Sequence, residues 1–162
     1  MGKLTDDMQR VVREQRLGYV ATVSPDGTPN LSPKGTLTVW DDDHLVFADI
    51  RSPATLRNLR INPAVEINVV DPVVRKGYRF KGKATVVDHG PLKDEIREFY
   101  ASRWIDTGQS MVELELRSFV LIKVEQALPL VSPSYDHPGI TEEEIRAAWS
   151  KHYQSLQPKA RR

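Results

Sequence analysis

Short apolar segments that alternate with polar residues follow one another along this chain, and many of them are connected by tight turns. The clearest turn is Pro25-Asp26-Gly27, which divides the β-rich stretch 17–40 in two. Proline presets the first dihedral angle of such a turn, and glycine accepts the left-handed conformation that follows. Strands joined by turns this short pair antiparallel, because parallel strands need a long crossover. The spacing therefore predicts a β-hairpin here and a largely antiparallel sheet overall.

Helical patterns interrupt this series, and the expected order is helix, three strands, short helix, two strands, helix, strand, helix. Thr5 is a candidate cap for the first helix, and Thr141 and Glu144 have the spacing of a capping box. The expected helices are residues 4–15, 51–63, 91–104 and 140–156, and the strands after the hairpin are 45–50, 64–70, 78–88 and 118–127. About six partly alternating strands with few helices predict a mainly β fold, a small antiparallel barrel rather than a doubly wound sheet.

Charge and composition exclude several classes of protein. With 23 basic and 22 acidic residues the formal net charge is +1, so no overall field favours nucleic acid or anionic membranes. The absence of cysteine excludes disulfides, thiolate catalysis and cysteine zinc sites. Residues 1–16 are too charged for a signal peptide, and no run approaches the roughly 18 apolar residues of a membrane span. We therefore expect a cytoplasmic protein with no membrane and no nucleic-acid partner.

Signatures of common catalytic sites are missing from the sequence. His44, His89, His137 and His152 are widely separated, and none pairs with an acid at metal-ligand spacing. No dinucleotide-binding fingerprint, P-loop or nucleophile elbow occurs. We therefore predict no metal site and name no catalytic residue. The basic and aromatic stretch 75–83 favours a solvated strand face, while a small-ligand role or single-stranded nucleic-acid binding stays open.

The stretch 51–63, "RSPATLRNLRINP", combines helix-start signals with positive charge and no acid. Ser52 is a good N-cap, Pro53 suits the first helical position, and Asn62-Pro63 ends the helix. A helix start after a strand offers free amides to an anion, although Pro53 has none to offer. The side chains that add donors or charge there are Arg51, Ser52, Thr55 and Arg57. On this stretch alone, a capped connector with a solvated basic face is the favoured interpretation over a phosphate site.

A second segment, residues 30–40, shifts that balance. Ser32, Pro33, Lys34 and Gly35 lie where the second hairpin strand begins. We expect the strand order to bring them beside the turn at 51–58. Such a strand could offer backbone hydrogen bonds to a flat polar ring, with Lys34 available to the charged end of the ligand.

Taken in order, these segments resemble the pyridoxamine 5'-phosphate oxidase-like family of FMN-binding split barrels. The similarity runs from about residue 8 to 127 and rests on the first helix and on residues 18–35, 44–67 and 79–87. The resemblance implies a six-stranded antiparallel split β-barrel that forms a homodimer, with FMN at the subunit interface. It implies a barrel domain at residues 1–130 and an extension at 131–162, whose helix packs on the barrel or on the partner subunit.

The resemblance also implies a cofactor site. The strand from Ser32 to Leu37 would lie along the isoalloxazine ring, and the turn from Asp49 to Asn58 would bind the ribityl phosphate. Residues 76–79 would come from the partner subunit or rim the ring. The implied cofactor-binding residues are Ser32, Pro33, Lys34, Gly35, Thr36, Leu37, Asp49, Ile50, Arg51, Ser52, Thr55, Leu56, Arg57 and Asn58.

Two departures from the family pattern bear on function. Residues 53–55 stand where the true oxidase has an Arg-Lys pair in its phosphate turn, and residues 131–149 lack its arginine and tryptophan constellation for pyridoxal phosphate. The resemblance thus implies FMN more than it implies pyridoxamine oxidation. We expect an FMN-dependent oxidoreductase with an unassigned substrate. The alternatives are a non-catalytic flavin-binding or sensing protein, and a member that uses a deazaflavin cofactor.

Overall fold

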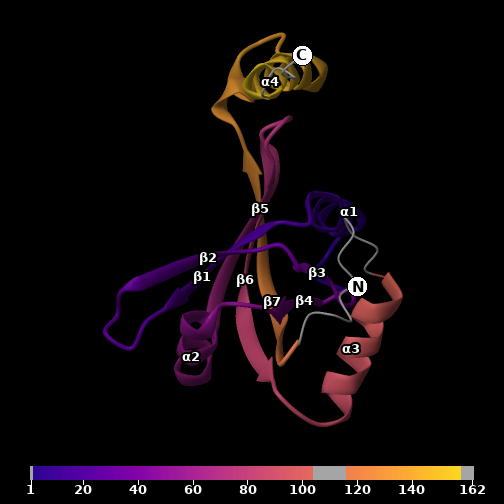
Figure 1. Ribbon diagram of the computed structural model, residues 1–162. Coiled ribbons are helices and arrows are strands. Elements are labelled where there is room, and N and C mark those ends of the chain that lie inside the picture. Colours follow the sequence, from indigo (N-terminus) through magenta and orange to yellow (C-terminus); the bar gives the residue numbers. More distant parts are fainter. Residues whose placement is uncertain (1, 104–115, 158–162) are drawn as a thin grey trace, which may run out of the picture.

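The computed structural model describes residues 2–103 and 116–157 and shows a curled antiparallel sheet with helices around it (Figure 1). The strands are β1 (Gly18–Val23), β2 (Pro29–Lys34), β3 (Thr38–Val39), β4 (His44–Asp49), β5 (Ala64–Asp71), β6 (Lys76–Val87) and β7 (Ser118–Val131). The helices are α1 (Asp6–Gln15), α2 (Pro53–Ile61), α3 (Pro91–Arg103), the 3₁₀ turn η1 (Pro133–Asp136) and α4 (Glu142–Leu156). Trp104 and residues 158–162, which the predictions included, lie outside the described residues.

The strand order β2-β1-β5-β6-β7-β4-β3 explains why the sheet curls. β2 and β3 form the two edges of this sheet, yet only residues 35–37 separate them in the chain. Since so short a connection spans at most about 14 Å, the two edges must lie close together, as in a barrel that is split at one seam. The Thr36 hydroxyl fastens this connection to β4 by donating to the backbone oxygen of Ala48 at 2.8 Å.

The predicted fold class, a mainly β antiparallel split barrel, is confirmed, but the described part of the chain has seven strands rather than six. The difference arises in the stretch expected to be one strand at 30–40. A turn at Gly35 and Thr36 interrupts it. The first half pairs with β1 and the second half with β4, so the chain crosses from one edge of the sheet to the other.

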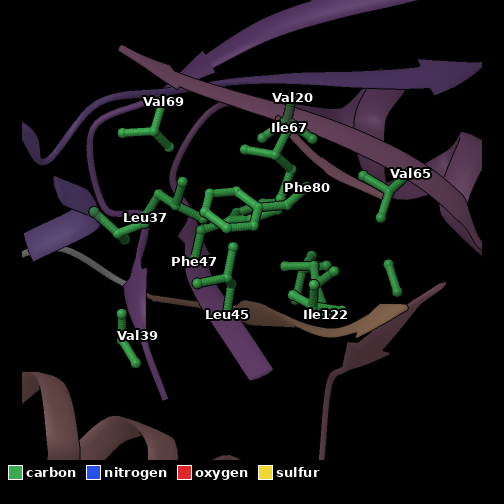
Figure 2. Close-up of a cluster of buried hydrophobic side chains, with 14 of the residues drawn as sticks. Val20, Leu37, Val39, Leu45, Phe47, Val65, Ile67, Val69, Phe80 and Ile122 are labelled. Atoms are coloured by element: carbon green, nitrogen blue, oxygen red, sulfur yellow. The ribbon is translucent and has the colours of Figure 1, made fainter. Parts of the chain in front are cut away.

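The barrel core comes from the inward side of every strand except β2, together with residues of α1, α2 and the β2–β3 connection (Figure 2). Figure 2 shows Phe80 of β6 near the centre of the cluster, with Val20 of β1 and Ile67 of β5 beside it. The register aligns Val20 with Ile67 and Ile67 with Phe80, which places these three side chains in one row. All three are at most 1% exposed, so the alternation read from the sequence identifies the inner face correctly.

Helices close the barrel on different sides. α1 starts at its expected cap, where Thr5 Oγ1 accepts from the Met8 amide at 3.3 Å, and it buries Val11 and Val12. α2 fills the connection between β4 and β5 and lies beside the β1–β2 hairpin (Figure 1). α3 packs through Ile96 and Tyr100 in a second core cluster with residues of β4 and β7. No helix in the described ranges is long and apolar enough to cross a membrane.

α4 stands apart from the barrel, at the end of an arm formed by the β5–β6 turn and the last residues of β7 (Figure 1). Its predicted capping box, Thr141 with Glu144, is confirmed. Lys76 binds Glu142 at 2.9 Å, and Arg75 lies 4.1 Å from the ring centre of Trp149. No residue of α4 is buried within this chain. Its packing against a partner subunit therefore stays a prediction.

Candidate functional site

Lys34 is the residue around which the candidate site is built. It ends β2 on the same side as Ser32, while Leu31 and Pro33 face outward. Only 4% of Lys34 is exposed, and its ammonium donates to Ser32 Oγ at 2.5 Å and to Ser52 Oγ at 2.7 Å. These contacts confirm that the strand at 30–34 lies beside the start of the helix at 51–63, as the strand order had indicated.

The ammonium of Lys34 has an unusual environment for a charge. Burial lowers the pKa of Lys34, and the nearby carboxylate of Asp49 opposes that shift only in part. Both hydrogen-bond partners are neutral hydroxyls, and no ion pair in the described part of the chain includes Lys34. A desolvated cation without a close anion costs free energy. The site is therefore one that a bound anion would stabilise.

The start of α2 adds backbone donors at the same place. Ser52 occupies the N-cap position, but its side chain makes no capping hydrogen bond, and its hydroxyl oxygen instead accepts a hydrogen bond from the Lys34 ammonium. The predicted N-cap position of Ser52 is therefore confirmed, but without the side-chain hydrogen bond that usually accompanies it. Pro53 has no amide proton, and the amides of Ala54 and Thr55 donate to no acceptor in residues 2–103 or 116–157. Free first-turn amides and the positive end of the helix dipole favour an anion here.

Thr55 and Asn58 face the β1–β2 hairpin rather than solvent. They are 1% and 0% exposed. The Asn58 amide group donates to Thr22 Oγ1 at 3.1 Å and to Ser24 Oγ at 3.4 Å. Asn30 reaches both Thr22 Oγ1 at 3.1 Å and Thr55 Oγ1 at 3.5 Å. This network holds α2 against the hairpin, and a direct contact of Thr55 or Asn58 with a cofactor stays a prediction.

Sequence reasoning missed the hairpin half of this network. Thr22 and Asn30 lie at inward positions of β1 and β2, where the alternation predicts apolar side chains. Polar residues at inward positions of a strand are the signal that could have identified them, because buried polar groups need partners. Asn58 Oδ1 remains buried without a hydrogen bond in the described structure.

The other predicted site residues divide into two groups. Those that are buried support the fold: Thr36, Leu37 and Leu56. Asp49 is half-buried and belongs to neither group. Those that are exposed are Pro33, Gly35, Ile50, Arg51 and Arg57. Arg51 directly precedes the start of α2, and Arg57 lies about one turn along that helix. Both can contribute long-range attraction to an anion, and their direct contact with one stays a prediction.

Residues 76–79 do not join Lys34 within one chain. Lys76 binds Glu142 of α4, and the Tyr78 hydroxyl donates to Asp7 of α1 at 2.5 Å. Their proposed contribution to the site of a partner subunit therefore stays a prediction.

The chemistry of these donors fits the phosphate end of FMN. The ammonium of Lys34, the hydroxyls of Ser32 and Ser52 and the first amides of α2 lie together, and among the described residues no carboxylate forms an ion pair with that ammonium. β2 is an edge strand, so its outer backbone groups are open to the polar edge of a flat ring. Lys34 supplies a positive charge even though the Arg-Lys pair is missing. In the described residues no cluster of side chains could hold a metal ion.

Comparison with known sequences identifies the family of this chain. The sequence model of the pyridoxamine 5'-phosphate oxidase family matches residues 4–130. The chain belongs to the pyridoxamine 5'-phosphate oxidase family. The matched region runs from the approach to α1 to the end of β7 and includes every residue of the candidate site. η1 and α4 lie beyond the matched residues, whereas the β5–β6 turn that supports α4 lies within them.

The individual proteins that resemble this chain share 30% or less of its sequence in the following comparisons. An uncharacterised protein of Methanocaldococcus jannaschii is 30% identical over 90 residues, which cover 54% of this chain and 59% of that protein. The chain thus spans about three fifths of that relative's length. HupZ of Group A Streptococcus is similar in structure, with 28% identity and a TM-score of 0.67 over 79% of this chain and 94% of HupZ.

Two further solved structures share the fold. An FMN-binding protein from Syntrophomonas wolfei has 16% identity and a TM-score of 0.64, over 80% of this chain and 87% of that one. An F420 reductase has 21% identity and a TM-score of 0.58, over 76% of this chain and 98% of that one. At these identities the likeness concerns the fold alone.

Proposed function

We propose that this protein binds FMN and acts as an FMN-dependent oxidoreductase on a substrate that is not assigned. The observation that carries the proposal is the buried ammonium of Lys34, which forms no ion pair within 4.0 Å with any described residue and lies beside the free amides of α2. Membership of the pyridoxamine 5'-phosphate oxidase family and the likeness to an FMN-binding protein support it.

The redox chemistry would be that of the bound flavin, and the protein would supply binding, orientation and electrostatics. Lys34 would neutralise part of the phosphate charge, and the hydroxyls of Ser32 and Ser52 would direct donors toward it. The network around Asn58 would keep the start of α2 fixed relative to β2. We assign no acid or base role to any side chain.

A homodimer with the cofactor near its interface is part of the proposal. Tyr19 of β1 and Leu31 of β2 lie on the outward side of two neighbouring strands and are 46% and 65% exposed. Leu128 of β7, 39% exposed, lies in the same cross-strand row as Tyr19, with Asn68 and Arg79 between them. Large apolar side chains gathered on one open sheet face are typical of an interaction surface. A second copy placed there would cover this face and bring new residues toward the edge strand β2.

Two other functions are separated from the first by experiment. One alternative is a flavin-binding or sensing protein, which would hold FMN without turnover. The other is a protein that binds a deazaflavin in place of FMN, and the F420 reductase of the same fold is the reason to consider it. Nucleic-acid binding is less well supported, because two cations of the basic strand, Arg79 and Lys81, already bind Glu66 at 3.1 and 3.2 Å.

Purification of the protein with its native ligand tests the proposal. We expect a flavin absorption spectrum, and mass spectrometry of the released ligand should identify FMN. A colourless protein that does not bind added FMN would refute it. A deazaflavin in the released ligand would instead favour a protein that uses a deazaflavin cofactor. Anaerobic reduction of the bound flavin by NAD(P)H then separates an oxidoreductase from a protein that only holds the cofactor.

A further inference from the structure

A small cavity lies where the end of α1, β3 and α3 meet, on the side of the barrel away from α2 (Figure 1). Its volume is about 240 Å³, below the roughly 300 to 1,000 Å³ of sites that hold drug-sized ligands, so it suits a small molecule. Residues 37–39, Phe99 and Tyr100 form its walls, which are mainly apolar and aromatic.

Two arginines give this cavity a positive charge. Arg13 lies in the last turn of α1, Arg16 directly follows the helix, and both line the cavity. Among the described residues that line it there is no aspartate or glutamate. Arg13 donates to the Gln9 side chain at 2.9 Å, and since a guanidinium has five N–H donors, Arg13 can offer others to a ligand. The lining therefore favours a ligand with negative charge.

The backbone of Arg16 is an independent sign of function. Its φ is 52°, in the left-handed region, where its amide ends α1 by donating to the Val12 oxygen at 3.2 Å. Glycine is the usual residue at such a position, because a Cβ is strained there. Strain of this kind is found mainly at ligand and active sites. An arginine in this place adds to the cavity a guanidinium that the favoured glycine would not provide.

The groove between α1 and α4 provides a contrast. Its volume is about 320 Å³, and cations on its rim already bind carboxylates of the same rim. Arg10 binds Asp7 and Glu14 at 2.6 Å, and Lys76 binds Glu142 at 2.9 Å. An anion would have to compete with these carboxylates, so the cavity beside Arg13 is the better anion site.

A carboxylate on a small apolar body matches this cavity. The planar guanidinium group of arginine can bind both oxygens of a carboxylate, and apolar walls suit the rest of the molecule. Leu37 lines the cavity and also ends the segment that we expect to lie along the flavin ring. A molecule bound in the cavity would therefore lie beside the end of that segment.

We infer that Arg13 and Arg16 bind the carboxylate of a small apolar molecule in this cavity, and that such carboxylates are the substrate class of the proposed oxidoreductase. The second part rests on the proposed function. A competing role for the two arginines is to complement the negative end of the α1 dipole. That role predicts a loss of stability when either is replaced, but no preference for a charged ligand.

Benzoate and benzamide separate these roles, because they have the same ring and nearly the same shape but only benzoate is charged. Isothermal titration calorimetry of the full chain with bound FMN gives both dissociation constants for the wild type, Arg13→Met and Arg16→Asn. Asparagine is chosen at position 16 because it accepts the left-handed conformation. Each variant should weaken benzoate binding about tenfold or more and leave benzamide binding within about twofold.

Arg97→Met, on α3 at a side chain that is 52% exposed, is the matched control and should change neither constant. Arg13→Met decides the question if Arg16→Asn folds poorly. No benzoate binding, equal binding of the two compounds, or a lower melting temperature with an unchanged benzoate preference would overturn the inference.

The substrate role has a test of its own. Benzoate bound beside the ring should shift the absorption band of FMN, and an unchanged spectrum at saturation would overturn this part alone. A protein that does not bind FMN would refute the proposed function and the substrate role. The benzoate preference, measured on the same protein without FMN, would then still decide whether the cavity binds carboxylates.

Discussion

Replacement of Lys34 by methionine tests the phosphate site most directly. The substitution keeps an unbranched side chain in a position that is 4% exposed and removes the ammonium that donates to Ser32 and Ser52. A charge-assisted hydrogen bond is worth about 1.5 to 3 kcal/mol, so FMN should bind about 10- to 150-fold more weakly. Riboflavin, which lacks the phosphate, should bind with nearly the same affinity as in the wild type.

Lys34→Met should weaken FMN binding, but it should leave the stability of the unliganded protein unchanged or increase it. The wild type bears the cost of a buried charge, and the hydroxyls of Ser32 and Ser52 are half-buried and can be hydrated after the substitution. We expect the free energy of unfolding in urea to change by less than about 1 kcal/mol or to increase. Lys83→Met, at a side chain that is 68% exposed, is the matched control and should affect neither flavin.

The pH dependence of stability and of FMN affinity gives a second test of the role of the Lys34 ammonium. Because burial lowers the pKa of Lys34 in the folded protein, the unfolded chain holds more protons between the folded and unfolded pKa values of this lysine. The stability of the unliganded wild type should therefore rise with pH through that window, and FMN affinity should fall as Lys34 loses its proton. Lys34→Met should show neither change. Equal losses of FMN and riboflavin affinity in this variant, or a large loss of stability, would refute the reasoning.

Three further predictions concern what holds the site in place. Tyr100→Phe should destabilise the protein by about 1 to 3 kcal/mol in urea unfolding, because the single proton of the buried hydroxyl is shared between two backbone oxygens, of Thr36 in the β2–β3 connection at 2.8 Å and of Val46 in β4 at 3.2 Å. Gly77→Ala should lower the melting temperature strongly, since a Cβ there would overlap a backbone oxygen of β5, whereas Gly35→Ala meets no atom within 4 Å and should be tolerated. Asn58→Ala should lower the free energy of unfolding by about 1 to 3 kcal/mol and should also weaken FMN binding. An unchanged melting temperature would contradict the role of the hydrogen-bond network between α2 and the β1–β2 hairpin.

The features that sequence reasoning predicted correctly are those that depend on neighbouring residues. The turn at Pro25-Asp26-Gly27 forms as expected, with Gly27 at a φ of 84° and its amide bonded to the Ser24 oxygen at 2.8 Å. The capping box of Thr141 and Glu144 is equally local. In each, one short stretch contains both the donors and the acceptors, so the pattern alone specifies the structure.

The features that it missed depend on contacts between distant residues. The stretch 30–40 has the pattern of one strand, and nothing local shows that its two halves pair with different neighbours. The turn at Gly35 and Thr36 is determined by the closure of the barrel, through the bond from Thr36 to β4. Likewise, Asn58 and Thr22 are 36 positions apart, so their pairing could not be read from either segment.

Ser52 shows how such a failure of a local rule indicates function. Local chemistry favours capping, because a serine before a proline at the first helical position normally accepts a first-turn amide. In the folded chain the same oxygen is the acceptor for Lys34, and satisfying a buried ammonium is worth more than satisfying an amide at a helix end. The consequence is that the amides of Ala54 and Thr55 keep their donors free beside a positive charge. Positions where local preference and folded structure disagree are expected at functional sites. Here the disagreement leaves a set of donors that a bound anion would satisfy.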